Sequence, residues 1–492
     1  MYNISKLFAS GTTYLIGSIF ERALPFLFLP IYTDVLSVED FGILSILSIM
    51  VMWPEKFVSA PIGNGITRHY YEPNYTSVRG SLIFTGYTFT FVQSVVFGAI
   101  IFAFGRQISG FLLNDASYTV YVQSFALVMI FRPLSNLMSS LARIQNNAKL
   151  YVTINIVVHA SAALVQFILL LVFKLGIMSM IIGAIYISIL MTILYLPNTK
   201  KIIELRFDRI LLKEILSFGY PLIIAAVVAL GSQTLDRIWV LKYLDLAAVG
   251  ILAIAYKIPL ILDFILAVPL KQTLVPVIYE MERNKTKQME FVKIATSHIT
   301  VLVVFCTLFL SASAQEIISL ITSGDSYNQA AQVAPYLLLS SASQSLALLF
   351  GYGLAMEKRT FLISLTSVYI LLIYVGCLSY LVPNFGLVGV GLATSIAYTC
   401  RNVIRGYLSL KYYGQTWEFK RIVTIIILGF ILYGISGTFV IQNMLLSLSV
   451  NIGISLLYIM IVYSGLVFEF KDLRKIYAEV LLSRVRKKKV SV

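Results

Sequence analysis

Apolar stretches recur along nearly the whole chain, from Gly11 to Phe468. Each is roughly 20 residues long, which is the length a helix needs to cross the hydrocarbon core of a bilayer. The composition agrees with this pattern, because 59% of the residues are hydrophobic and only 12% are charged, too few for the surface of a soluble protein of 492 residues. We therefore expect an all-α polytopic membrane protein.

About 14 transmembrane helices are predicted. The first stretch has no small-residue cleavage site, so we interpret it as a retained helix rather than a signal peptide. The predicted spans are 10–32, 41–63, 80–104, 119–141, 152–173, 177–197, 215–236, 244–266, 288–313, 331–355, 360–382, 386–410, 421–441 and 445–468.

The basic residues indicate an orientation. Most of the 38 Lys and Arg fall in alternate loops, and such loops stay on the cytoplasmic side. Both termini are therefore predicted to be cytoplasmic. This asymmetry accounts for the net charge of +15, so a nucleic-acid partner is not expected, whereas the basic tail is expected to touch anionic membrane lipids. The basic segments are 200–213, 271–293, 401–421 and 471–489.

An internal repeat is the next signal. A shift of 208 residues pairs Gly42 with Gly250 and Pro61 with Pro269, and after a slip of two residues Gly176 pairs with Gly386. Two lobes of six helices each are expected, in the same orientation and pseudo-symmetric about the membrane normal, with a cleft between them and two additional C-terminal helices. The predicted segments are lobe 1–199, basic linker 200–214, lobe 215–413, additional helices 414–468 and cytoplasmic tail 469–492.

Charged residues inside the predicted spans are the candidate site, because each costs roughly 2.5 to 3.5 kcal/mol to insert at a helix centre. Glu55 and Asp263 correspond under the 208-residue shift, which suggests a pair of acids facing one cavity. Asp236 and Arg237 end a span and are candidates for the cavity mouth. The charges within spans are Glu21, Arg22, Glu55, Lys56, Arg132, Lys257 and Asp263.

Two interpretations of these charges stay open. In one, they pair with each other and hold helices together, Asp263 with Lys257 for example. In the other, the four cations line a hydrated chamber and bind an anionic group such as a diphosphate. His159 could carry protons or be a hydrogen-bonded packing residue. Polar residues that could contact sugars are Asn136, Gln145, Asn155, Gln166, Gln233, Gln272 and Gln344.

Several kinds of site are missing from the sequence. No Gly-rich loop ending in Gly-Lys is present, so ATP is not expected to power transport. The remaining sources of energy are a gradient of H⁺ or Na⁺, the membrane potential and a substrate gradient. No metal-ligand spacing and no cofactor motif are recognised. The three cysteines, Cys306, Cys377 and Cys400, lie in apolar context and are interpreted as packing residues.

The first predicted span and the loop after it resemble a known family. Residues 11–46, GTTYLIGSIFERALPFLFLPIYTDVLSVEDFGILSI, contain Leu36-Ser37, the acidic pair Glu39-Asp40 and Gly42. This pattern is similar to the first-helix signature of the polysaccharide-transporter branch of the MOP (multidrug/oligosaccharidyl-lipid/polysaccharide) superfamily, which includes the Wzx-type O-antigen flippases. The two-times-six repeat and the two extra helices agree with that resemblance.

The resemblance implies a function. Such a protein is a flippase, not an enzyme, and moves an undecaprenyl-diphosphate-linked oligosaccharide across the bacterial cytoplasmic (inner) membrane by alternating access. It would serve O-antigen or capsule-like polysaccharide synthesis, with the polymerase machinery as a candidate partner. Arg22, Lys56, Arg132 and Lys257 would form its cationic cavity, with Glu21, Glu55, Asp263 and His159 as charge partners or ion-coupling groups.

Two rival functions remain. An ion-coupled drug exporter of the same superfamily would share the fold and the repeat, but an acidic chamber is more typical of it. A membrane glycosyltransferase or polymerase could use acids of the first outer loop, Asp34, Glu39 and Asp40. It would not explain the internal repeat.

Overall fold

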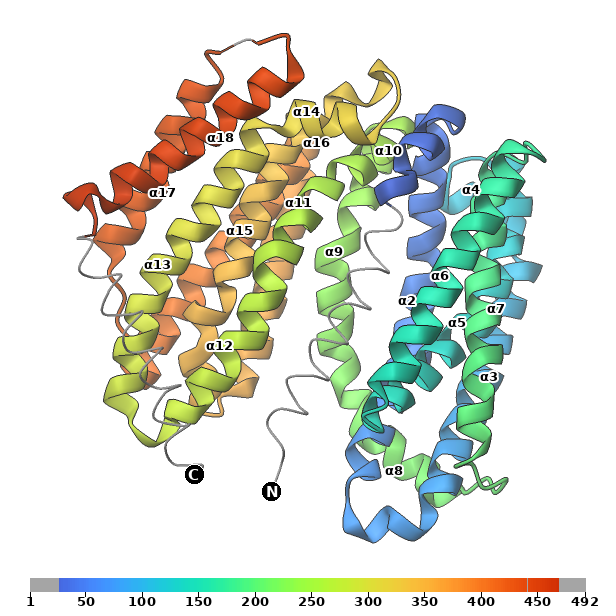
Figure 1. The fold of residues 1–492 in the computed structure, drawn as a ribbon. Coiled ribbons are helices and arrows are strands. Elements are labelled where there is room, and N and C mark those ends of the chain that lie inside the picture. The colour runs from blue at the N-terminus through green and yellow to red at the C-terminus, as the bar shows by residue number, and fades with distance from the viewer. Residues whose placement is uncertain (1–25, 440, 469–492) are drawn as a thin grey trace. The chain divides into compact units, whose positions relative to one another are not determined.

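The computed structural model describes residues 26–439 and 441–468, without the side chains of Arg283 and Leu466. Every regular element in those ranges is helical (Figure 1). Twelve helices there are long and apolar enough to cross a membrane. The prediction of an all-α polytopic membrane protein is confirmed.

The elements follow one another with short connections. After an apolar helix at Phe26–Val35, the first half of the chain contains α2 (Val38–Tyr70), η1 (Pro73–Val78), α3 (Arg79–Ala103), α4 (Gly105–Leu112), η2 (Ala116–Tyr118), α5 (Thr119–Ile144), α6 (Ala148–Leu171), α7 (Ile177–Lys200), α8 (Arg209–Gly219), η3 (Tyr220–Leu222) and α9 (Ile223–Tyr243). The second half contains α10 (Leu246–Ala255), α11 (Lys257–Leu262), η4 (Asp263–Ala267), α12 (Val268–Glu280), η5 (Met281–Arg283), α13 (Lys285–Ala312), α14 (Ala314–Ile321), η6 (Asp325–Tyr327), α15 (Asn328–Met356), α16 (Thr360–Tyr413), α17 (Phe419–Ser436), α18 (Met444–Ile461) and η7 (Val462–Leu466).

The predicted count of 14 spans is approximate. The predicted span 10–32 lies mostly outside the described residues. The predicted spans 360–382 and 386–410 are joined in α16, a helix of 54 residues whose backbone leaves the helical region at Gly386. Span positions otherwise agree with the prediction.

Contacts divide the chain into two units. The first contains the described residues up to Ile254 with Leu320–Tyr327 and Leu378–Leu387, and the second contains Ala255–Ser319, Asn328–Cys377 and the described residues from Val388 onward. Helices α8 and α9 belong to the first unit, where both pack on α2. The division into two six-helix lobes at residues 200–214 stays a prediction.

The core of the first unit is an apolar cluster to which α2, α3, α5, α6, α7 and α8 contribute. Polar groups inside it are satisfied locally: the Tyr87 hydroxyl donates to the carbonyl of Leu137, and Asn155 Nδ2 donates to the Tyr195 hydroxyl. Such internal pairing is required where water is absent. Buried members from the six helices are Ile62, Leu82, Leu141, Val158, Tyr195 and Ile215.

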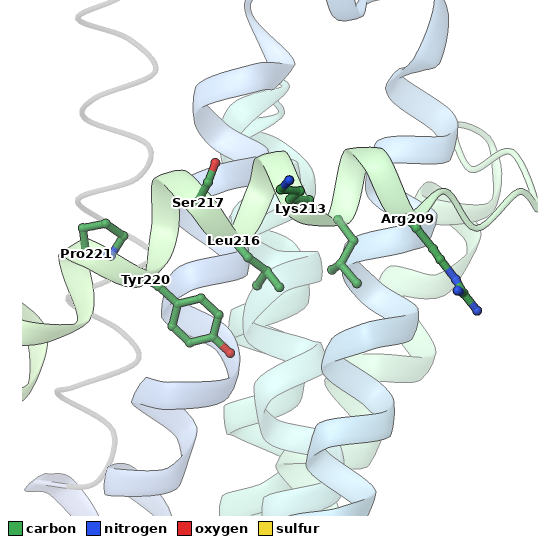
Figure 2. Close-up of a pocket in the computed structure, with 7 residues that line it drawn as sticks. Arg209, Lys213, Leu216, Ser217, Tyr220 and Pro221 are labelled. Atoms are coloured by element: carbon green, nitrogen blue, oxygen red, sulfur yellow. The ribbon is translucent and has the colours of Figure 1, made fainter.

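Helix α8 lies across one end of this bundle (Figures 1 and 2). Asp208 caps it by accepting from the backbone N–H groups of Ile210 and Leu211. Its buried residues Leu211 and Ile215 are four apart and so form one face, which packs on α2 and α3. An amphipathic helix of this kind is typical of a membrane interface.

The internal repeat is visible in the elements themselves. The short helix α4 at Gly105–Leu112 recurs as α14 at Ala314–Ile321, and the turn η2 at Ala116–Tyr118 recurs as η6 at Asp325–Tyr327. Both pairs keep the same offset, from position 105 to 314 and from position 116 to 325. The repeat therefore extends to the loops between helices.

The predicted pairing of Gly176 with Gly386 is matched in the backbone. Gly176 has φ 54° and ψ −134°, and Gly386 has φ 57° and ψ −135°. Only glycine adopts this combination without strain. The N-caps of α6 and α16, Asn147 and Arg359, form another matching pair, whose offset is slightly larger than that of the two glycines.

In the second unit, α13 contacts α15, α17 and α18. The predicted additional helices α17 and α18 therefore pack on α13, around a cluster that includes Ile425 and Tyr458. Ser447 of α18 donates to Glu316 of α14, and Asn451 donates to the carbonyl of Ala312. These contacts join the two helices to the body of the unit.

Helices α15 and α16 are joined by a repeating contact. Three side chains of α16, spaced seven residues apart, donate to carbonyl oxygens of α15 that have the same spacing, so the two helices run parallel in a coiled-coil-like register. We call this series the α15–α16 ladder. Its members are Ser395 with Tyr336 at 2.7 Å, Asn402 with Ser343 at 2.6 Å and Ser409 with Phe350 at 2.8 Å.

One predicted cytoplasmic loop begins too early in the sequence. Segment 401–421 is expected among the basic cytoplasmic loops, although it overlaps the predicted span 386–410. Helix α16 in fact continues to Tyr413 and contains both Arg401 and Arg405. Basic residues lower the hydropathy of a segment to that of a loop, but Arg401 and Arg405 belong to the long helix.

Candidate functional site

The centre of the first unit contains a charge cluster between α2 and α5. Glu55 is 6% exposed; its carboxylate forms an ion pair with Arg132, with 3.2 Å between Oε2 and Nε, and accepts a hydrogen bond from Asn136 Nδ2 at 2.6 Å. Both Glu55 and Arg132 lie near the middle of long helices, far from either end. Arg132 has no acid in its own helix, and its partner comes from another one.

The Glu55 contact uses only part of the Arg132 guanidinium. Nε faces the carboxylate, whereas Nη1 and Nη2 make no hydrogen bond to any described residue, and the Arg132 side chain is 39% exposed. The guanidinium is thus held by one nitrogen and presents two others. Two N–H donors side by side match the spacing of two oxygens of a phosphate or carboxylate.

Lys56 adds a second positive charge on α2. It is half-buried and forms no ion pair within the described ranges. Because Glu55 balances only one of the charges of Arg132 and of Lys56, which follows Glu55 in the sequence, the four residues Glu55, Lys56, Arg132 and Asn136 have a formal net charge of +1. We refer to these four residues as the α2–α5 cluster.

The predicted mouth residues connect α9 to α2. Asp236 is fully buried and accepts from the backbone N–H of Arg237 at 2.9 Å and from its Nη1 at 3.4 Å. Arg237 Nε donates to Ser45 Oγ at 2.9 Å. A second link runs from Trp53 Nε1 to Thr234 Oγ1 at 3.2 Å. These contacts fix α9 against the helix that carries Glu55 and Lys56.

The remaining predicted charges lie elsewhere. The second unit contains Lys257 at the start of α11 and Asp263 at the start of the π-helical turn η4, and both elements pack on α15. Glu21 and Arg22 lie outside the described residues. Only Lys56 and Arg132 of the four predicted cations are thus placed in one unit, and a common chamber for all four stays a prediction.

His159 lies in α6. Its Nδ1 is 2.8 Å from the carbonyl oxygen of Asn155, one turn earlier on the same helix. This local contact is compatible with the packing interpretation and leaves the proton-carrying interpretation as a prediction.

One acid of the loop before α2, Asp40, has a structural role. Asp40 Oδ2 accepts from the backbone N–H of Ser37 at 2.9 Å, and Ser37 Oγ accepts from the backbone N–H of Asp40 at 3.1 Å. The two residues thus form a capping box at the start of α2. This role explains Asp40 without a glycosyltransferase site.

Two hollows accompany these residues. One is an open hollow of about 610 Å³ along α8 and the turn that follows it, where Arg209 and Lys213 lie with Leu216 and Tyr220 (Figure 2). The other is an apolar groove of about 1050 Å³ within the second unit, among α13, α15, α16 and α17. Within the described ranges no group of three or more His, Cys, Asp or Glu could hold a metal ion.

Sequence reasoning misses some polar contacts. Asn136 is expected only as a sugar contact, whereas its amide binds Glu55. Arg401 and Arg405 are expected in a basic loop segment, although α16 carries both. Their position inside the predicted span 386–410 was the signal that could have found them.

The sequence matches known proteins over much of its length. The family described as polysaccharide biosynthesis protein matches residues 33–332, more than half of the chain. A protein of the Lsg locus of Haemophilus influenzae is 26% identical over 286 residues, which cover 57% of this chain and 68% of that protein. An uncharacterized membrane protein of the same organism is 25% identical over 286 residues, or 56% of this chain and 66% of that relative.

Solved structures share the fold. The lipid II flippase MurJ in an inward closed conformation has a TM-score of 0.72 at 17% identity, covering 92% of this chain and 99% of that one. An inward-facing multidrug resistance MATE transporter of the MOP superfamily has a TM-score of 0.60 at 11% identity, covering 81% and 94%. With its helices, its repeat and these matches taken together, the chain belongs to the polysaccharide biosynthesis protein family and has the fold of the flippases and transporters of the MOP superfamily.

Proposed function

We propose that this protein is a flippase that moves an undecaprenyl-diphosphate-linked oligosaccharide across the bacterial inner membrane by alternating access. The observation that carries the proposal is the state of Arg132, whose Nε is held by Glu55 while Nη1 and Nη2 make no hydrogen bond to the described residues. A guanidinium so positioned is prepared to bind an oxyanion.

The chemistry suits a diphosphate. A phosphate group accepts two parallel hydrogen bonds from an arginine, and a nearby lysine adds a point charge. Lys56 is adjacent in sequence to Glu55 and has no acid of its own among the described residues. The net charge of +1 in the α2–α5 cluster would be offset by the bound diphosphate, which reduces the cost of keeping cations inside the membrane. Arg22 and Lys257 would extend this site.

The lipid chain and the sugars need different surroundings. The apolar groove of about 1050 Å³ in the second unit has the size and lining that a polyprenyl chain requires. Sugars would meet polar side chains such as Gln233, Gln272 and Gln344. The family match to polysaccharide biosynthesis supports a glycan-bearing substrate.

The membrane assignment follows the same reasoning. Basic residues on α8 and in the segment before it favour the cytoplasmic side for that end of the first unit, so both termini would be cytoplasmic. Anionic lipids would contact α8, and the polysaccharide polymerase machinery would receive the flipped product.

A drug exporter is the second candidate, because the MATE transporter shares the fold. The excess of positive charge in the α2–α5 cluster favours an anionic substrate over the cationic compounds that an acidic chamber would select. Coupling to H⁺ or Na⁺ through Glu55 or Asp263 is part of the proposal and is measured as a dependence of the flipping rate on either gradient.

A reconstitution assay tests the proposal. Purified protein in liposomes receives a fluorescent undecaprenyl-diphosphate oligosaccharide, and flipping is read from the access of an external quencher to the label. We expect flipping above that of protein-free vesicles, and much less with a monophosphate-linked glycan of the same length. Equal rates for the two lipids would contradict diphosphate recognition, and export of a cationic dye without lipid flipping would favour the exporter.

A further inference from the structure

Arg401 lies deep within α16, between the backbone break at Gly386 and the helix end at Tyr413. At about 1.5 Å of rise for each residue, it is about 22 Å from the break and about 18 Å from the helix end. The predicted span ends at residue 410, about 14 Å from Arg401 along the helix, which is farther than an arginine side chain extends. Contact with the membrane surface therefore does not account for its charge.

Arg401 and Arg405 also point away from the apolar surface of α16. Val403 and Tyr407 are exposed and belong to the face that lines the apolar groove. Residues two apart on a helix differ by about 200°, so Arg401 lies opposite Val403 and Arg405 lies opposite Tyr407. Both cations are therefore directed toward protein.

Arg405 is hydrogen-bonded to its neighbours through Nε and Nη2. Its Nε donates to Thr366 Oγ1 at 3.1 Å, and its Nη2 donates to Ser367 Oγ at 2.8 Å and to the carbonyl of Ile363 at 3.2 Å. These acceptors lie near the start of α16, so Arg405 links the two parts of the long helix. All these partners are neutral, and no described acid compensates its charge.

Arg401 differs from Arg405 in having unused donors. Its Nε and Nη2 are buried and make no hydrogen bond within the described ranges, and no acid there pairs with it. Its guanidinium carbon lies 4.6 Å from the ring centre of Tyr398, a cation–π contact that leaves the N–H groups unsatisfied. Nε and Nη2 form the edge of a guanidinium that binds two oxygens at once. Burying such an edge unpaired is costly.

A buried amide lies in the same layer of the unit. A Cβ added to Gly351 of α15 would lie 3.5 Å from Arg405 Cδ. The α15–α16 ladder repeats every seven residues, so a contact like that of Gly351 with Arg405 is expected seven residues earlier on both helices. Gln344 therefore lies opposite Tyr398, the residue whose ring Arg401 covers. Gln344 Oε1 is buried and accepts no hydrogen bond among the described residues. This part of the unit thus contains an amide oxygen and a guanidinium edge that lack partners among the described residues.

We propose that Arg401, with Gln344 beside it, is an oxyanion site within the second unit that takes a carboxylate or a phosphate group. Arg401 contributes the two-donor edge, and Arg405 adds positive charge one turn away. Gln344 contributes a further N–H once its amide is turned so that Nε2 takes the place of the unpartnered Oε1. Arg401 as a whole is half-buried, and its Nε and Nη2 are the buried atoms. The site contains none of the residues of the α2–α5 cluster.

Two sources could supply the anion. One is a carboxylate on an acidic sugar of the glycan, and the other is phosphate, from the lipid-linked substrate or free in solution. The assignment to a substrate rests on the proposed flippase function, whereas oxyanion binding at Arg401 does not. A binding measurement therefore tests the site even if flipping is not observed.

The test uses the full-length protein in nanodiscs and phosphate-free buffer, with Arg132→Gln as the background so that the α2–α5 cluster contributes less. Binding of glucuronate, inorganic phosphate and neutral glucose is followed by the shift of the melting temperature with concentration. Arg401→Gln removes the donor edge, Arg401→Lys keeps the charge and loses the fork, and Lys411→Gln is the control near the end of the same helix.

We expect glucuronate or phosphate to raise the melting temperature and glucose to have no effect. Arg401→Gln should weaken the apparent affinity at least about tenfold, Arg401→Lys by less, and Lys411→Gln should not change it. The tighter of the two anions identifies the chemical group, carboxylate or phosphate, that the site takes. Equal affinities in the background and in Arg401→Gln would overturn the proposal; if Arg401→Gln does not fold, an unchanged affinity in Arg401→Lys would also overturn it.

Discussion

Gly42 in α2 and Gly250 in α10 are counterparts in the internal repeat, and each packs against the first residue of the other's helix. A Cβ at Gly42 would lie 2.0 Å from the carbonyl oxygen of Leu246, and a Cβ at Gly250 would lie 1.9 Å from that of Val38. Val38 and Leu246 are related by the same shift as the two glycines. The contact is thus reciprocal, and only glycine allows the two backbones to approach so closely.

Alanine at either glycine should therefore destabilise the protein. Gly42→Ala or Gly250→Ala places a methyl group on a backbone carbonyl, and we expect a loss of about 1 to 3 kcal/mol in the free energy of unfolding in mixed micelles. Gly434→Ala in α17 is the matched control, because nothing lies within 4 Å of its Cβ position. Unchanged stability in Gly42→Ala would show that the helices do not cross this closely.

Glu55→Gln should destabilise the α2–α5 cluster. The substitution removes the counter-charge of Arg132 and turns an amide toward the guanidinium. Because Arg132 is 39% exposed, we expect about 1 to 3 kcal/mol rather than the larger cost of breaking a fully buried pair. Glu72→Gln is the control, since its partner Arg68 is 58% exposed and the expected loss is about 0.5 kcal/mol. Equal losses in the two variants, measured by unfolding in mixed micelles, would argue against a special role for the Glu55 pair.

The α15–α16 ladder makes a separate prediction. Asn402→Ala removes the donor to the carbonyl of Ser343, and interhelical hydrogen bonds in membranes contribute about 1 kcal/mol. Thr424→Ala serves as the control, because the exposed Thr424 hydroxyl bonds only within its own helix, to the carbonyl of Lys420. The melting temperature should fall for Asn402→Ala and stay near that of the wild type for Thr424→Ala. A matching decrease in both would remove the ladder as a source of stability.

The amphipathic helix α8 should select anionic lipids. Each basic residue near such a surface contributes about 1 kcal/mol, so reversing both charges in Arg209→Glu with Lys213→Glu should lower the enrichment of anionic lipid around the protein about tenfold or more. Co-purified lipid, counted by mass spectrometry, gives the enrichment. Lys174→Glu changes an exposed lysine between α6 and α7 and should have little effect. If Lys174→Glu lowered the enrichment of anionic lipid and the α8 variant did not, the proposed orientation, with α8 on the cytoplasmic side, would be contradicted.

The fold could be predicted from the sequence because its signals are long. Apolar runs of about 20 residues define spanning helices whatever their neighbours. The repeat could be found from glycines and prolines, and the pairing of Gly176 with Gly386 depends on a backbone conformation that few other residues adopt.

The site was harder to predict because it depends on how helices are rotated. Glu55 and Asn136 are far apart in the sequence, and no local pattern indicates that their side chains meet. Arg401 is easily counted with the basic loop that follows it, because charge and hydropathy alone do not distinguish a cation at a helix end from one inside a helix; the length of α16 makes that distinction.

The most direct test of the central claim is the initial rate of flipping of an undecaprenyl-diphosphate oligosaccharide by Arg132→Ala, with Arg143→Ala in the last turn of the same helix as the control. Both variants must insert in equal amounts. We expect Arg132→Ala to lose at least about tenfold in rate, since it removes the paired donors for a phosphate, and Arg143→Ala to keep the wild-type rate. Wild-type flipping by Arg132→Ala would contradict the cationic site proposed for this protein.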